Sequence, residues 1–280
     1  MPPIYGSDYE RMCCGCTSVL ASQMVSRTAS TNPITSSSYI LDSACGPGIV
    51  TQEIKRLYPD ARILASDLSP AMLADVERKR GQLGWKDVET KVLDVRSLEG
   101  INDETFSHVF VNLGIQIPND PEGPVKMTRE VFRVLKTGGV AILSNWADRV
   151  WPAAYEETRK EIRPSDTSKS PMAAFKNPPS GSWFMKQLEE GGFNNNVELL
   201  PVTTYTSAKD MDELVENMML AKGMFFPDYS NNELEKAKRV LRDEFAKLRT
   251  FEKTQEGVRI GMKAWIGVAW KKGDEGETVW

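Results

Sequence analysis

The sequence is poor in histidine and cysteine and has no long apolar segment. Its 280 residues include one histidine, His108, and four cysteines, Cys13, Cys14, Cys16 and Cys45. The spacing of these residues does not match a zinc-binding framework, so we expect no metal site and interpret the cysteines as buried or half-exposed thiols. No run approaches the about 18–20 apolar residues that span a bilayer, and the N-terminus lacks a basic region followed by an apolar one. We therefore expect a cytoplasmic protein that makes no contact with membranes.

Long runs of one charge are also missing. The formal net charge is -4, and acidic and basic residues are mixed along the chain. Without a basic stripe, a phosphate backbone is an unlikely match, which excludes nucleic acid as a partner. The composition is ordinary for a globular protein, and the length suits one large domain. We expect small-molecule partners and a monomer or homodimer.

Short apolar runs alternate with helical patterns from residue 39 onward. The runs are rich in β-branched or aromatic residues, and the first four end at Asp42, Asp67, Asp94 and Asn112. Such alternation over about 100 residues predicts a parallel sheet with helices on both faces. The expected fold is α/β, with a doubly wound, mostly parallel sheet. The expected strands lie at 39–41, 62–65, 88–93, 106–111, 140–143, 197–202 and 263–270, which makes seven.

Helix signals lie between these strands and beyond them. Ser69 and Pro70 suit the N-cap and first position of one helix, and another pattern stops before the expected turn at Gly138-Gly139. One helix is expected near residues 8–26, another over 182–191, a third after an N-cap at Ser207, and a long one over 231–251. The strands near 200 and 265 are expected to form an antiparallel edge of the sheet.

We expect residues 1–280 to form a single domain. Its segments are an N-terminal lid at 1–38, a ligand-binding core at 39–146, a helical cap with one strand at 147–255, and a final strand at 256–272.

A glycine-containing turn follows the first expected strand. Gly46 and Gly48 would let the backbone approach a ligand where any Cβ would clash. Asp67 ends the second strand, where a carboxylate can accept both hydroxyl groups of a ribose. Together these residues predict a nucleoside-binding site at the carboxyl edge of the sheet.

Two nucleoside ligands suit such a loop. The dinucleotide fingerprint requires a third glycine where this chain has Thr51, and an anionic pyrophosphate is disfavoured beside Asp42. S-adenosylmethionine instead carries a cationic sulfonium and ammonium, which suit Asp42. Asp94 is then placed to hydrogen-bond an adenine amino group, with Val95 against the ring. The residues favour S-adenosylmethionine as the cofactor.

The same segments carry a family resemblance. The chain resembles the class I S-adenosylmethionine-dependent methyltransferases, in particular fungal natural-product enzymes of the gliotoxin bis-thiomethyltransferase type, over roughly residues 8–146. The segments that resemble the family are LDSACGPG, ASDLSPAML, ETKVLDV and SHVFVNLGIQ.

The resemblance implies a Rossmann-like fold, S-adenosylmethionine as methyl donor and S-adenosylhomocysteine as product. It also implies an N-terminal lid helix, which Tyr9, Glu10 and Arg11 would supply. The residues expected at the cofactor are Tyr9, Arg11, Asp42, Ala44, Cys45, Gly46, Gly48, Asp67, Leu68, Met72, Asp94, Val95, Asn112 and Leu113.

Methyl transfer is an in-line displacement from an activated sulfonium, so positioning and desolvation do much of the work. His108 lies four residues before Asn112, roughly 13 Å from the carboxyl edge, and we reject it as a general base. The absence of a histidine base favours a thiol or a nucleophilic nitrogen, while a Tyr, Asp or Glu base stays open. We assign no catalytic residue.

The expected reaction is S- or O-methylation of a small secondary metabolite. N-methylation, or a cofactor-assisted cyclisation or rearrangement, is the alternative. The candidate acceptor-binding residues are Gln116, Trp146, Trp151, Phe175, Trp183, Met218, Met219 and Phe225.

Overall fold

The computed structural model describes residues 6–116, 120–166 and 178–273. The chain divides into two compact units. The sheet unit comprises Leu20–Asn145, Ser180–Val202 and Trp265–Trp280, and the helical unit comprises Met1–Val19, Trp146–Pro179 and Thr203–Ala264. Three strands have residues in both units: β5 (Leu135–Asp148), β6 (Val197–Ala208) and β8 (Gly257–Trp270).

The sheet confirms the α/β prediction. Seven strands follow the order β3-β2-β1-β4-β5-β8-β6, and an eighth strand, β7, pairs with β8. The pairs β1–β2, β1–β4, β2–β3 and β4–β5 are parallel. The bounds are β1 Tyr39–Ser43, β2 Arg62–Asp67, β3 Val88–Val92, β4 Phe106–Val111, β5 Leu135–Asp148, β6 Val197–Ala208, β7 Phe251–Thr254 and β8 Gly257–Trp270. The strand β7, which forms an antiparallel hairpin with β8, was not predicted.

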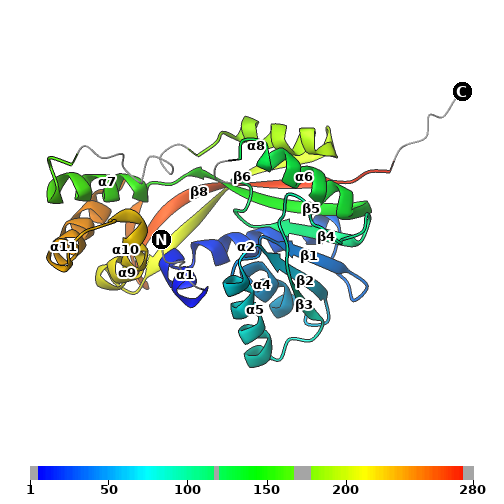
Figure 1. The fold of residues 1–280 in the computed structure, drawn as a ribbon, viewed down its shortest axis with the longest axis horizontal. Helices are drawn as coiled ribbons and strands as arrows, with labels where there is room; N and C mark the ends of the chain where they lie inside the picture. Colours follow the sequence, from blue (N-terminus) through cyan, green and yellow to red (C-terminus); the bar gives the residue numbers. More distant parts are fainter. Residues whose placement is uncertain (1–5, 117–119, 167–177, 274–280) are drawn as a thin grey trace, which may run out of the picture. The chain divides into compact units, whose positions relative to one another are not determined.

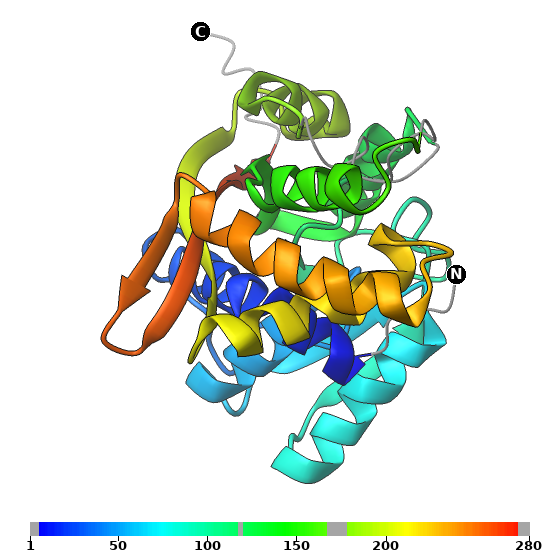
Figure 2. The same cartoon turned by 90° about the vertical axis from the view of Figure 1, so that its left-hand side faces the viewer.

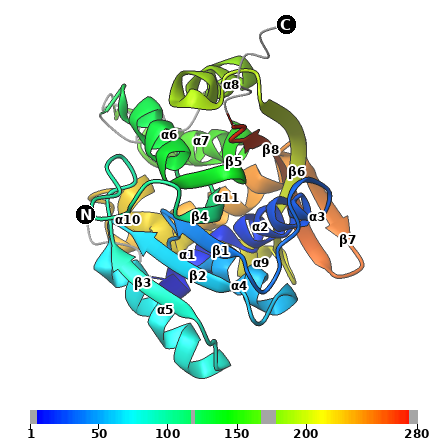
Figure 3. The same ribbon diagram turned by 90° about the vertical axis from the view of Figure 1, so that its right-hand side faces the viewer.

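Helices cover both faces of the parallel strands (Figure 3). The helices α4 (Ile49–Leu57) and α5 (Pro70–Leu83) lie on one face, and α6 (Gly123–Val134) and α8 (Gly181–Leu188) on the other. A five-residue π-helical turn, Glu189–Phe193, continues α8. The core under α6 and α8 is built from alternate strand residues such as Leu41, Val109 and Val111, because successive strand side chains point to opposite faces.

Two local predictions in this unit need correction. Ser69 is the N-cap of α5 and Pro70 opens the helix, but the Ser69 side chain makes no capping hydrogen bond. Gly138 and Gly139 do not form a turn before a strand, because β5 runs through both. The Gly138 N–H donates to the carbonyl of Lys271 at 2.7 Å, and the Lys271 N–H donates to Gly139 at 3.1 Å, so the glycines belong to a paired strand.

The single helix expected near 8–26 is two helices, α1 (Gly6–Cys13) and α2 (Cys16–Ser26). The break lies at Cys14 and Gly15, which both have positive φ angles, 46° and 84°. Since residues in this conformation cannot continue a right-handed helix, the chain turns there. A short helix, α3 (Thr28–Thr31), follows α2.

The helical unit contains α7 (Trp151–Ile162), which the sequence did not predict, and α11 (Asn231–Lys247), which lies beside it (Figures 1 and 2). Between them come α9 (Met211–Met218), a 3-10 turn (Met219–Ala221) and α10 (Lys222–Phe225). Ser207 is not an N-cap, because it lies within β6. Asp210 caps α9 instead, and its side chain accepts a hydrogen bond from the N–H of Glu213.

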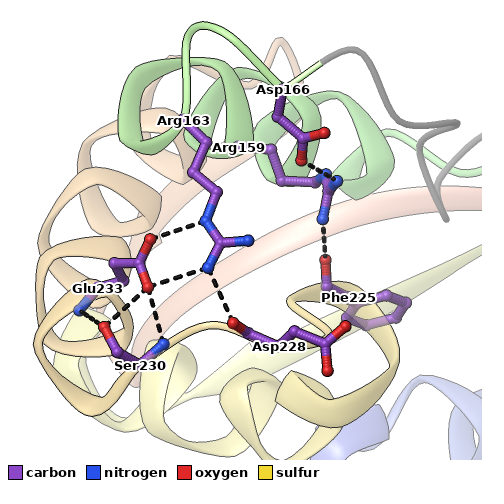
Figure 4. A network of polar contacts seen from close by, with 7 residues as sticks. All are labelled: Arg159, Arg163, Asp166, Phe225, Asp228, Ser230 and Glu233. Carbon is purple, nitrogen blue, oxygen red and sulfur yellow. Dashed lines mark hydrogen bonds and ion pairs between the residues drawn. The ribbon is translucent and has the colours of Figure 1, made fainter.

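A polar network joins α7 to the start of α11 within this unit (Figure 4). Arg163 donates to both carboxylate oxygens of Glu233 at 2.7 and 3.0 Å, and to the carbonyl of Asp228 at 2.8 Å. Glu233 also completes a capping box with Ser230. One further arginine, Arg159, donates to the Phe225 carbonyl and to Asp166. No helix among the described residues combines the length and apolarity needed to cross a membrane.

Candidate functional site

The loop between β1 and α4 is held by the carboxylate of Asp67 at the end of β2. Asp67 Oδ2 accepts a hydrogen bond from the N–H of Gly46 at 2.9 Å, and Oδ1 accepts one from the N–H of Ser69 at 2.8 Å. The N–H of Cys45 donates to the Ser66 carbonyl at 2.9 Å. One side chain therefore ties the glycine loop to the start of α5 and stays half-exposed at the carboxyl edge.

The two glycines of the loop serve different purposes. Gly46 has a φ of 53°, and among the described residues no atom beyond its chain neighbours lies within 4 Å of where a Cβ would stand. Gly48 has a φ of 79°, and a Cβ there would lie 3.0 Å from Val76 Cγ2 on α5. Gly46 therefore leaves its backbone open to a ligand, whereas Gly48 lets the loop pack against a helix.

A third small residue, Ala44, also has a positive φ angle, 50°. It lies against the segment after β4, where a Cβ on Gly114 would stand only 2.9 Å from the Ala44 Cβ. The sequence analysis did not single out Gly114. The feature of the sequence that could have indicated Gly114 is its position, two residues after Asn112 and close to the end of a predicted strand.

Asp42 is buried beneath this loop, with 1% of its surface exposed. Its Oδ2 accepts hydrogen bonds from the N–H and the hydroxyl group of Thr51, at 2.9 and 2.6 Å. Burial raises the pKa of Asp42 to about 7. Its Oδ1 is buried and has no hydrogen-bond partner among the described residues.

Thr51 belongs to the first turn of α4, so the Asp42 carboxylate occupies the helix N-terminus where a pyrophosphate would bind in a dinucleotide fold. In the sequence, Thr51 is notable only because the dinucleotide fingerprint has a glycine at this position. In the structure its hydroxyl group holds the acid, and a second anion beside Asp42 would be repelled.

Asp94 follows β3, and the structure pairs it with Arg96. Arg96 donates from Nε and Nη2 to the carboxylate, at distances from 2.5 to 3.1 Å, and from Nη1 to Asp120 at 2.8 Å. Hydrogen bonds from Arg96 hold the pKa of Asp94 below its ordinary value. Val95 packs against the core beneath. Sequence reasoning placed Asp94 correctly at the edge but missed Arg96 as its partner.

The end of β4 is held by a serine that the sequence analysis also missed. Ser144 on β5 donates to Asn112 Oδ1 at 2.9 Å and accepts the N–H of Leu113 at 2.9 Å. Leu113 has a φ of 60°, which Ser144 stabilises by satisfying its N–H. Gln116 is half-buried a few residues on.

Two expected cofactor residues lie after β2 on the same edge. Leu68 is 63% exposed, so its apolar side chain is accessible at this edge. Met72 is half-buried in the first turn of α5. Cys45 is buried within the loop, and its thiol contacts the Gly46 carbonyl at 3.3 Å.

The helical unit gathers several of the other expected residues. Tyr9, Trp146 and Trp151 pack around the buried cluster of Cys13, Cys16 and Met262. Arg11 is exposed and donates to Asn217 Oδ1 at 3.2 Å. The expected acceptor-binding residues Met218, Met219 and Phe225 belong to the apolar core of this unit.

Two more expected acceptor-binding residues lie elsewhere. Trp183 lies on α8 in the sheet unit and packs against the core there. Phe175 lies outside the described residues.

His108 has a structural environment. It is the third residue of β4, is 1% exposed, and its two ring nitrogens contact Ser107 Oγ and the Asn32 carbonyl, each at 2.8 Å. Burial lowers its pKa from the ordinary value. In the described parts of the chain, no three His, Cys, Asp or Glu side chains are grouped to hold a metal ion.

Known proteins share both the sequence motifs and this fold. Residues 40–139 match a family model described as a methyltransferase domain. Methyltransferase ucsB of Acremonium sp is 33% identical over 131 residues, which cover 42% of this chain and 44% of that protein. The acetylaranotin bis-thiomethyltransferase of Aspergillus terreus is 22% identical over 210 residues, 70% of each chain.

Among solved structures, a Bacillus halodurans protein provisionally described as a methyltransferase has a TM-score of 0.57 at 18% identity. The match covers 89% of this chain and 99% of that one. Three curated relatives, the Acremonium protein among them, are matched over only 42% to 66% of their own length. The fungal resemblance inferred from the motifs is confirmed. Residues 40–139 are therefore similar in sequence to a methyltransferase domain, and the sheet that contains them has the Rossmann-like fold of solved methyltransferase structures.

Proposed function

We propose that this protein binds S-adenosylmethionine at the carboxyl ends of β1, β2 and β3 and transfers its methyl group to a small molecule, releasing S-adenosylhomocysteine. The observation that carries the proposal is the open backbone of Gly46, flanked by the carboxylate of Asp67. A nucleoside can approach this backbone without meeting a side chain, and the acid stands beside it.

The residues present fit the chemistry of this cofactor. Each oxygen of Asp67 accepts one backbone N–H, so each keeps a lone pair for a ribose hydroxyl group. Asp42, whose Oδ1 has no hydrogen-bond partner among the described residues, places a negative charge beneath the loop in its ionised form, and a cationic ligand would stabilise that form. Leu68 offers an exposed apolar side chain at the same edge.

Asp94 would have to accept hydrogen bonds from Arg96 and from the adenine at the same time. Its carboxylate accepts hydrogen bonds from Arg96, so an adenine amino group would share the carboxylate with the guanidinium. A carboxylate has about four lone-pair sites, which allows both donors. Asn112 and Leu113, positioned by Ser144, complete the proposed cofactor-binding set on the β4 side.

When bound, the cofactor supplies a methyl group that is already activated by its sulfonium, so the chain has to orient and desolvate the reactants. The proposed acceptor is a secondary metabolite, methylated on sulfur or oxygen. Similarity to the Acremonium methyltransferase and to the acetylaranotin bis-thiomethyltransferase supports this class. The proposed acceptor-binding residues remain Gln116, Trp146, Trp151, Phe175, Trp183, Met218 and Met219.

The first experiment is calorimetric titration of the purified protein with S-adenosylmethionine, S-adenosylhomocysteine and NADH. Binding of the first two at micromolar concentration, without NADH binding, is the expected result. Absence of binding to both adenosyl compounds would overturn the proposal.

The second experiment distinguishes methyl transfer from the alternative reactions. The protein is incubated with methyl-labelled S-adenosylmethionine and panels of thiols, phenols and amines, and the products are weighed by mass spectrometry. A labelled methyl group on a thiol or phenol supports the proposal. A labelled amine would indicate N-methylation, and a product of unchanged mass that needs the cofactor would indicate cyclisation or rearrangement.

A further inference from the structure

Cys13 and Cys16 form a buried pair at the break between two helices. Cys13 is the last residue of α1 and Cys16 the first of α2, and they are 8% and 4% exposed. The residues between them, Cys14 and Gly15, both have positive φ, the pattern of a tight type I′ turn. A disulfide joins Cα atoms about 4.4–6.8 Å apart, a separation that two residues on either side of a two-residue turn can have.

The side chains of Cys13 and Cys16 lie together in one buried cluster with Met262. The hydrogen bond from the Cys16 thiol lowers the pKa of Cys13 and raises that of Cys16. Further hydrogen bonds from Tyr9 and Thr17 also lower the pKa of Cys13, against the effects of its burial and of Glu10. Cys13 is therefore the more acidic thiol, and the thiolate is the nucleophilic form of cysteine.

The backbone of the pair is anchored on β6. The Cys16 carbonyl accepts a hydrogen bond from Thr204 Oγ1 at 2.5 Å, and the Cys14 carbonyl accepts one from the N–H of Ser207 at 2.9 Å. These contacts hold the turn in one conformation, so the two sulfurs stay together in the folded protein.

Cys14 provides an internal contrast within the same turn. Its thiol donates to the Arg11 carbonyl at 3.0 Å, and its side chain packs in the apolar core of the helical unit, away from the cluster of Cys13, Cys16 and Met262. Burial raises the pKa of Cys14 to about 12. Cys13 and Cys16 therefore share one buried cluster, whereas the side chain of Cys14 belongs to the neighbouring apolar core.

We propose that Cys13 and Cys16 are a redox-active dithiol that is oxidised to a disulfide by exchange with a small-molecule disulfide. The Cys13 thiolate attacks one sulfur of the disulfide RSSR, forming a mixed disulfide and releasing one RS⁻. Cys16 then loses its proton, and its sulfur attacks Cys13 Sγ and releases the second RS⁻. Both cysteines are oxidised and RSSR is reduced to two RSH, which take up the two thiol protons.

The test uses the full chain and oxidised glutathione as the disulfide. After equilibration and an acid quench, free thiols are alkylated with N-ethylmaleimide and the protein is digested with trypsin. Cleavage after Arg11 and Arg27 places Cys13, Cys14 and Cys16 in one peptide. The expected peptide carries one alkylated residue, Cys14, and has lost two hydrogens through a Cys13–Cys16 bond. Three alkylated cysteines, or a bond that includes Cys14, would overturn the proposal.

Single variants assign the order of attack. Cys16→Ser is expected to accumulate glutathione on Cys13, at least about tenfold more than on Cys14, because nothing resolves the mixed disulfide. Cys13→Ser should leave Cys16 reduced. The matched control is Cys14→Ser, which keeps the pair and should form the disulfide to the same extent as the natural sequence. Loss of the bond in Cys14→Ser, checked for folding by circular dichroism, would contradict the assignment.

Discussion

Thr51 donates two hydrogen bonds to the buried carboxylate of Asp42, from its backbone N–H at 2.9 Å and its hydroxyl group at 2.6 Å. Thr51 stands where a dinucleotide fold would have its third glycine. The pair places a carboxylate at the N-terminus of α4 and removes the attraction of that helix end for a phosphate. The same contact that disfavours a pyrophosphate favours a cation above the loop.

The first prediction concerns pH and the stability of the fold. Burial raises the pKa of Asp42 from its ordinary value of 3.8 to about 7. The folded protein then binds this proton more tightly than the unfolded chain, so its contribution to stability is fully present below about pH 4 and is lost as pH rises through about 7. Asp42→Asn removes this titration. The Tm of the variant minus the Tm of the natural protein should therefore increase from about pH 4 to about pH 8. Parallel Tm curves for the two proteins would contradict the assignment.

The second prediction concerns Asp67. Asp67→Asn keeps one acceptor oxygen but loses the charge and one of the two contacts to the N–H groups of Gly46 and Ser69. We expect the Kd for S-adenosylmethionine to rise about 10- to 100-fold, since hydrogen bonds to charged groups contribute about 1.5–3 kcal/mol. Calorimetric titration measures the change. Asp60→Asn, at an exposed position, serves as the control and should bind as the natural protein does.

The third prediction separates the two loop glycines. Alanine in a left-handed conformation costs roughly 1–2 kcal/mol, and this cost applies at both Gly46 and Gly48. Gly48→Ala also places its Cβ 3.0 Å from Val76, which overpacks the loop against α5 and should add about 1–3 kcal/mol.

Gly46→Ala meets no such contact among the described residues, so it should keep most of its stability and lose cofactor affinity instead. Denaturant unfolding and calorimetric titration of both variants measure the two effects. Equal affinity in Gly46→Ala and the natural protein would mean that the ligand does not approach this backbone.

The fourth prediction concerns the polar network of the helical unit. Hydrogen bonds from Arg163 hold the pKa of Glu233 at about 2, below its ordinary value of 4.5. The resulting stability is present above about pH 4.5 and is lost as pH falls toward about 2. Glu233→Gln retains capping capacity at α11 but not the charge, so its Tm should be lower than that of the natural protein at neutral pH.

The difference in Tm should shrink as the pH approaches about 3. Glu235→Gln is the matched control, because Glu235 is exposed and forms its ion pair with Lys238 on the same helix. A Glu233→Gln difference that stays constant with pH would show that the effect is not electrostatic.

Much of the sheet unit could be predicted from the chain because its signals are local. The predicted strand ends lie close to the observed ones: β2 ends at Asp67, β1 continues one residue past Asp42, and β3 ends two residues before Asp94. The helix α7 was missed because its segment opens with Trp151 and Pro152 amid prolines and polar residues, whose local preferences do not indicate helix. The helix expected near residues 8–26 breaks at Cys14 and Gly15 because both residues have positive φ angles. Positive φ is uncommon for residues other than glycine, so the sequence did not indicate it at Cys14.

The sequence by itself determined which residues lie near the ends of the strands. An acid or a glycine in a strand–turn–helix pattern can be recognised from its neighbours in the chain, without knowledge of distant contacts. It thereby indicated the fold class and predicted the kind of cofactor. Only the tertiary structure decided which groups those residues contact. Thr51 binds Asp42, Arg96 binds Asp94, and Ser144 holds the backbone after β4. Cys13 and Cys16 share one buried cluster, while Cys14 belongs to the neighbouring apolar core. Such pairings depend on how separate segments pack, and hydrogen-bond geometry at about 3 Å selects one partner from several that the sequence allows.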